Sequence, residues 1–99
     1  MGLMMVRAKL KAECIDEAEA AGRKLFSAID REQLRGIRYA SCRLPDGVTY
    51  LNLLQLEDGI RNPLLALPES RAFQENLKNW LAEPANSESL TTIGSYRLF

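Results

Sequence analysis

Three cationic residues alternate with small apolar residues near the start of the chain. They are Arg7, Lys9 and Lys11. Side chains of this kind can stabilise a phenolate, an enolate or a carboxylate in a ligand site. They can equally lie at the rim of a sheet, since long cationic side chains commonly extend into water. Both interpretations stay open at the level of the sequence.

A second group of residues offers hydroxyl, phenol and amide groups on segments rich in β-branched and aromatic residues. Its members are Tyr39, Ser41, Tyr50, Asn52 and Tyr96. Small-molecule pockets combine apolar walls with a few polar groups of this type. The same residues could instead fill an interface between sheets, with tyrosine hydroxyls reaching water at its edge. Together with Arg7 and Lys9 they are the predicted ligand-pocket residues.

The chain has no histidine, which removes the commonest general base near neutral pH and the usual metal and haem ligand. Cys14 and Cys42 have neither a CxxC spacing nor histidine neighbours, so neither a metal site nor a disulfide is expected. We expect two small buried thiols instead. No metal or other cofactor is predicted, and no residue is assigned as catalytic.

Composition indicates one compact domain spanning residues 1–99. Lys and Arg number 13, and so do Asp and Glu, so no overall field favours nucleic acid or an anionic membrane. No apolar run approaches the length of a membrane span, and the opening MGLMM is too short for a signal peptide. We therefore expect a cytoplasmic protein with neither nucleic acid nor membrane as a partner.

The first half of the chain alternates strand and helix patterns. Residues 5–11 alternate strictly and predict a strand, while residues 13–32 carry apolar residues at helical spacing, with acids early and bases late. Residues 36–44 and 48–57 are β-rich, and Pro45, Asp46 and Gly47 lie between them. They predict a hairpin.

The second half repeats the helix-then-strand order. A short helical turn is expected at 63–67, followed by a helix beginning near Glu69 whose inner face includes Trp80 as a core residue. Residues 82–89 predict a polar loop, and residues 90–99 predict a final strand. The resulting order is β-α-β-β-α-β, an α+β ferredoxin-like fold with an antiparallel four-stranded sheet and both helices on one face.

The third predicted strand has large apolar residues on both of its faces, although the helices can cover only one. Leu51 and Leu53 share one parity, while Tyr50, Leu54 and Leu56 share the other. A second copy of the sheet is the simplest cover, which predicts a homodimer packed sheet to sheet.

The helices should cover the face of Val6, Ala8 and Leu10, since these are the apolar residues of the first strand. Arg7 and Lys9 then point toward the partner sheet. We expect the predicted tyrosines, Ser41 and Asn52 on that same face, with Arg7 directed at the anionic group of a small aromatic or anionic ligand.

The chain resembles the small dimeric α/β-barrel proteins of the antibiotic biosynthesis monooxygenase type. Their second helix is entered through a motif approximating H-x-x-S-P-H-F-x-x-F. The corresponding positions here are Leu64, Leu67, Pro68, Glu69, Ser70 and Phe73. The proline and the last phenylalanine match, while Leu64 and Glu69 replace the two histidines.

The resemblance implies a dimeric α/β barrel and a cofactor-independent monooxygenase-like activity on an electron-rich aromatic molecule. A haem-degrading activity is set aside because it relies on a histidine. The alternative is a non-catalytic ligand-binding or structural dimer. An enzyme of this kind should enclose a cavity of about 300 Å³ or more, which a structural dimer would fill with side chains. RNA binding is disfavoured, because the first strand lacks the aromatic stacking residues of RNA-recognition domains.

Overall fold

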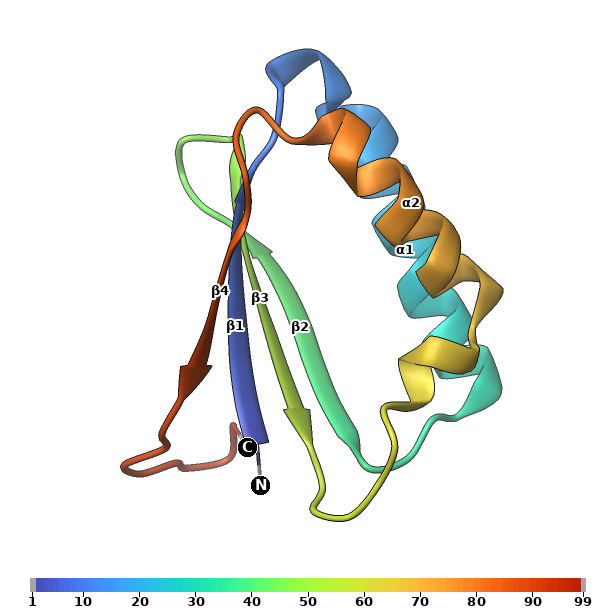
Figure 1. Ribbon diagram of the computed structural model, residues 1–99, viewed down its shortest axis with the longest axis vertical. Helices are drawn as coiled ribbons and strands as arrows, with labels where there is room; N and C mark the ends of the chain where they lie inside the picture. Colours follow the sequence, from blue (N-terminus) through green and yellow to red (C-terminus); the bar gives the residue numbers. More distant parts are fainter. Residues whose placement is uncertain (1, 99) are drawn as a thin grey trace.

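The computed structural model describes residues 2–98, and within them the chain forms four strands and two α-helices (Figure 1). The elements are β1 (Gly2–Lys9), α1 (Ile15–Glu32), β2 (Ile37–Arg43), β3 (Thr49–Leu56), α2 (Pro68–Trp80) and β4 (Asn86–Leu90), with short 3₁₀ turns at Ala12–Cys14 and Pro63–Ala66. This order confirms the predicted ferredoxin-like α+β fold.

The sheet has the strand order β2-β3-β1-β4, and every neighbouring pair is antiparallel. Both helices lie on one side of it (Figure 1). In the register of β1 and β3, Ala8 lies opposite Tyr50 and Arg7 lies opposite Leu51. Residues directly opposite in an antiparallel pair point to the same side, so this register decides which side chains meet the helices.

Helix α1 follows the predicted electrostatic pattern. Asp16 and Glu17 lie in its first turn and Arg31 in its last, which complements the helix dipole. The helix ends where Gln33 takes a left-handed φ of 49° and its backbone N–H donates to Asp30 and Ile29 carbonyls. Among residues 2–98, no helix combines the length and the apolar character needed to cross a bilayer.

The core between helices and sheet is divided into two clusters. One contains Ala8, Leu10, Ala18 and Trp80; the other contains Leu25, Ala28, Leu64 and Leu67. Phe73 of α2 packs against both clusters. Several of the residues in the first cluster are small, which leaves room beside it.

The connection between β2 and β3 is closed by Asp46, as expected for turn chemistry. Its carboxylate accepts hydrogen bonds from the backbone N–H groups of Val48 and Thr49 and from the Thr49 hydroxyl, at 3.0, 2.9 and 2.6 Å. These bonds, with the Thr49 hydroxyl contributing most, lower the pKa of Asp46 to about 2. The turn thereby fixes the start of β3, next to Tyr50.

The last strand lies where a polar loop was expected. β4 occupies Asn86–Leu90, whereas residues 91–98 form no strand and turn back toward the start of β1 (Figure 1). An edge strand needs backbone groups that reach its neighbour, and it can pair while its side chains stay polar and exposed. The prediction of a strand over 90–99 is therefore wrong, and Phe99 lies outside the described residues.

The expectation of two buried thiols is wrong, because neither thiol is fully buried. Cys14 is half-buried, but Cys42 is exposed. Cys42 pairs with Leu51 in the register of β2 and β3, so it points to the face of the sheet that the helices do not cover. Within residues 2–98 no further layer shields it.

Trp80 is the main side chain that ties α2 to the core, and its replacement tests that role. It is 4% exposed, packs edge-on against Phe73 with ring centroids 5.5 Å apart, and donates its indole N–H to Glu17 at 3.1 Å. Trp80→Ala should lower the free energy of unfolding by about 3–5 kcal/mol. Trp80→Leu should cost less, since it restores apolar contact but not the hydrogen bond. Urea denaturation measures both, and equal losses would contradict a packing role.

Candidate functional site

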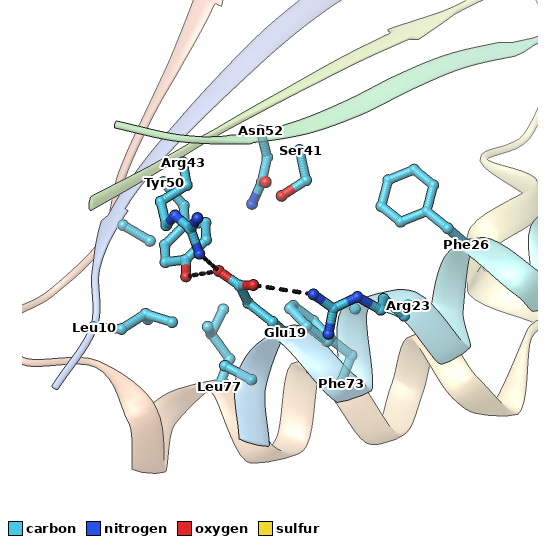
Figure 2. A pocket seen from close by; sticks show the side chains of 13 residues that line it. Leu10, Glu19, Arg23, Phe26, Ser41, Arg43, Tyr50, Asn52, Phe73 and Leu77 are labelled. Atoms are coloured by element: carbon cyan, nitrogen blue, oxygen red, sulfur yellow. Dashed lines mark hydrogen bonds and ion pairs between the residues drawn. The ribbon is translucent and has the colours of Figure 1, made fainter. Parts of the chain in front are cut away.

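A pocket of about 430 Å³ lies between the sheet and the helices (Figure 2). Its lining comes from α1, α2 and the first three strands: Ala8, Leu10, Ala18, Glu19, Gly22, Arg23, Phe26, Ser41, Arg43, Tyr50, Asn52, Phe73 and Leu77. The surface that they expose to the pocket is mostly apolar, although six of them also carry a polar or charged group. The volume is that of a site for a small organic molecule.

Aromatic rings make up two of the pocket walls, and each is supported from behind. Phe26 stacks on Tyr39 with centroids 5.0 Å apart and planes inclined by 18°. Phe73 is supported by Trp80 in an edge-to-face contact. A flat apolar ligand would meet walls that are already held in position.

The space itself comes from small residues on the inner face of α1 and on β1. At Ala8, Ala18 and Gly22 the side chains are too short to fill the space between the helices and the sheet, which larger side chains would occupy. A Cβ atom added at Gly22 would lie 4.0 Å from the nearest ring carbon of Phe73, which is an ordinary contact. Gly22 is therefore not required by the backbone, and its effect is to widen the pocket.

One carboxylate on the pocket wall collects three donors. The Tyr50 hydroxyl donates to Oε2 of Glu19 at 2.5 Å, and the Arg43 guanidinium donates to the same oxygen at 2.6 Å. Arg23, one helical turn along α1, contacts Oε1 at 3.3 Å. These interactions are drawn in Figure 2. They connect α1 with β2 and β3 at one side of the pocket.

The hydrogen bonds move the pKa values of the two acidic partners in opposite directions. The Tyr50 hydroxyl, followed by Arg43 and Arg23, holds the pKa of Glu19 below its usual value. Burial raises the pKa of Tyr50, and the hydrogen bond to Glu19 and then the Glu19 charge raise it further. Near neutral pH the pair is thus a carboxylate and a neutral phenol.

The opposite wall of the pocket is formed by the sheet and carries two neutral polar groups. The side chains of Ser41 and Asn52 point into the space between the sheet and Glu19 (Figure 2). The Asn52 Oδ1 atom is buried and has no hydrogen-bond partner within the protein. A buried acceptor without a partner is costly, so a ligand donor placed there would be favourable.

The structure separates the predicted pocket residues into two groups. Ser41, Tyr50 and Asn52 line the pocket, and Tyr39 supports it through Phe26. All four point toward the helices, because their strand register places them on the side of Ala8. The expectation that they share a face with Arg7 is wrong. It overlooked that residues opposite each other in an antiparallel ladder point to the same side.

Arg7 and Lys9 lie on the other face of the sheet. They border a polar recess of about 200 Å³ together with Asp46, Thr49, Glu83, Pro84 and Asn86. The recess mixes both signs of charge, unlike the apolar pocket. Tyr96 belongs to neither group, since it lies after β4 and is 82% exposed.

Glu19, Arg23 and Arg43 are pocket residues that the sequence patterns did not single out. Glu19 had a detectable signal, because it interrupts the apolar face of α1, between Ala18 and Gly22. A charge on that face must find partners in the folded chain. Within residues 2–98, no three His, Cys, Asp or Glu side chains gather as a metal site would require.

Solved structures share this fold. A protein of Nitrosomonas europaea assigned to the antibiotic biosynthesis monooxygenases is similar with a TM-score of 0.76 and 17% identity, over 95% of this chain and 100% of that chain. Another antibiotic biosynthesis monooxygenase gives 0.75 and 12%, over 95% and 100%. The cofactor-independent oxygenase SnoaB of Streptomyces nogalater gives 0.70 and 14%, over 97% and 96%. At these identities the likeness concerns the fold.

Sequence comparison adds no closer assignment. No protein-family profile matches the chain, and no curated protein matches it. The structural likeness confirms the fold-level resemblance to the antibiotic biosynthesis monooxygenases.

If Gly22 serves only to widen the pocket, its replacement by alanine should stabilise the protein. Gly22→Ala should raise the free energy of unfolding by about 0.5–1 kcal/mol, because alanine favours the helix and its methyl group has room. Thermal and urea unfolding measure the change. Ala20→Gly, at an exposed position of the same helix, should cost a similar amount. A loss of stability in Gly22→Ala would show that the pocket wall cannot accept a methyl group.

Proposed function

Given a fold shared with a cofactor-independent oxygenase, we propose that this protein binds an electron-rich aromatic small molecule and oxygenates it without a cofactor. The observation that carries the proposal is the pocket of about 430 Å³ with aromatic walls and a mostly apolar surface. A purely structural domain would fill this space with its own side chains. The space instead has the size and lining of a ligand site.

The pocket residues can supply what such a reaction needs from the protein. Phe26, Phe73 and Leu77 offer the ligand apolar contacts on the side of the helices. Polar groups on both walls orient it. The substrate, once deprotonated, provides the electrons that reduce dioxygen. At a CH2 carbon such as that of an anthrone, two carbon–hydrogen bonds break and one oxygen atom becomes the carbonyl oxygen, while the other oxygen leaves as water with the two hydrogens. The protein contributes binding and orientation.

Binding without turnover is the second candidate function. It is favoured by the absence of histidine, because a base must then come from a carboxylate or another less usual group. It uses the same pocket and the same apolar contacts. Oxygen consumption separates it from the enzyme.

Oxygen uptake with a panel of anthrones, hydroquinones and flavonols tests the proposal, without added metal or flavin. At least one class should consume oxygen faster than it does spontaneously. Gly22→Leu, which places an isobutyl group in the pocket, should return the rate to background while the protein stays folded. Binding of panel members without uptake would favour the ligand-binding protein, and neither binding nor uptake would contradict both functions.

We also propose that the protein is a homodimer formed by the sheet face opposite the helices. Met5, Leu51, Leu53 and Leu90 share this face, as the strand registers show, and are partly exposed, whereas Leu3 on the same face is already buried. Such a set of apolar side chains favours a cover, and a second copy supplies one of matching shape. The exposed thiol of Cys42 lies on the same face and can report on it.

Light scattering behind a sizing column should give twice the mass of one chain at micromolar concentration. In a Cys14→Ser background, the remaining thiol of Cys42 should react slowly with a bulky thiol reagent, because the partner covers it. Leu53→Arg should give a monomer whose Cys42 reacts quickly, since a charge at this position opposes burial. A wild-type monomer, or a dimer with a fast-reacting Cys42, would contradict assembly through this face.

A further inference from the structure

We infer that Glu19 selects ligands that carry a neutral hydroxyl group, by accepting a hydrogen bond from that hydroxyl inside the pocket. Tyr50 and Arg43 are then positioning residues for its carboxylate. The inference rests on the proposed function, because it assigns a role within the same pocket. It names the ligand as a flat aromatic molecule with a hydroxyl on the edge that faces α1.

The carboxylate has acceptor capacity left after its internal bonds. An ionised carboxylate offers about four lone-pair sites. Oε2 uses two of them for the short bonds from Tyr50 and Arg43. Oε1 has one contact, at 3.3 Å, with Arg23. One acceptor site on Oε1 therefore remains for a ligand.

The carboxylate is also held in one orientation before a ligand arrives. Its two short bonds come from the end of β2 and the start of β3, so the sheet fixes a side chain that belongs to α1. A group ordered in advance loses little conformational entropy when it binds. The single donor of Tyr50 is engaged, and Arg43 gives Glu19 one of its five N–H donors while its side chain stays 51% exposed. The free site on the less exposed partner is therefore an acceptor, Oε1 of Glu19.

The charged and titratable groups that face Glu19 are Arg23 on α1, Arg43 on β2 and Tyr50 on β3, while β1 and α2 present apolar side chains. Two guanidinium groups against one carboxylate make an anionic ligand the competing class. The exposure of the charged side chains favours the neutral hydroxyl ligand over the anionic one. The side chains of Arg23 and Arg43 are 75% and 51% exposed, but that of Glu19 is 22% exposed. Arg23 and Arg43 also line the pocket, but their greater exposure leaves them more hydrated than the carboxylate, so a ligand inside gains most from Glu19.

Three naphthalene probes test the inference by their affinity for the wild-type protein. 2-Naphthol offers a neutral hydroxyl, 2-methoxynaphthalene has the same ring without a donor, and 2-naphthoate carries an anion. The naphthol should bind about tenfold more tightly than the methoxy compound, the size of one charge-assisted hydrogen bond. The naphthoate should bind more weakly than the naphthol. Calorimetric or fluorescence titration gives all three affinities.

Glu19→Gln should reduce the preference for naphthol over the methoxy compound to about twofold or less, because a neutral amide is the weaker acceptor. Asp16→Asn removes a charge from the same helix at an exposed position outside the pocket. It should leave the preference unchanged. Unfolding curves show whether each variant is folded.

The pH profile tests the positioning roles, since neither neutral naphthalene titrates at acidic pH. Selectivity requires the carboxylate, so it should persist above the pKa of Glu19 and be lost as the pH falls through that pKa. Because Tyr50 and Arg43 lower this pKa, the loss in wild type should fall below the usual carboxyl range. Tyr50→Phe and Arg43→Gln should move it to higher pH. A merely structural role would change both affinities together and leave the midpoint unmoved.

The outcomes separate this inference from the proposed function. If both neutral probes bind equally, or if Glu19→Gln keeps the preference, the role of Glu19 is wrong while the pocket stands. Tightest binding of the naphthoate would assign the site to anions and overturn the inference. If no probe binds to wild type, the proposed function fails and the inference with it.

Discussion

The pairing of β1 with β3 is the constraint on which the rest of the structure depends. It sets Ala8 opposite Tyr50 and Val6 opposite Asn52, so small and apolar positions of one strand share a side with polar positions of the next. A slip of one residue would exchange all of these side chains between the two faces. The pocket and the apolar outer face follow from the same register.

The polar cluster of Glu19, Tyr50 and Arg43 explains how helices and sheet stay together around an open space. The small side chains there do not fill the space between the helices and the sheet. Apolar contacts therefore cannot join the two layers along their whole length. Hydrogen bonds from two strands to one carboxylate bridge the gap instead. Because the cluster is partly exposed, its net contribution to stability is small, and its main effect is to fix geometry.

Sequence patterns predicted those parts of the structure that depend on periodic burial. Alternation identified the strands of the first half, and helical spacing identified α1 and α2. The last strand was misplaced, because Asn86–Leu90 is defined by backbone pairing with β1 and carries little apolar signal. Ser41, Tyr50 and Asn52, which were predicted to line a ligand pocket, lie along the cavity under the helices, whereas the prediction placed them on the opposite side of the sheet. To assign the correct side, the register of β1 and β3 must be known. Long-range strand pairing sets this register, and local periodicity does not encode it.

The polar character of β4 has a consequence for how copies of this chain can associate. An open sheet presents unpaired backbone groups at both edges, and these can recruit further strands without limit. Here Glu88 lies on one edge strand, and Arg38 and Arg43 lie on the other. Polar and charged side chains along an edge must lose water when another strand packs against them, which disfavours fibre-like growth. The polar composition of β4, which made the strand hard to recognise from the sequence, thus also opposes aggregation.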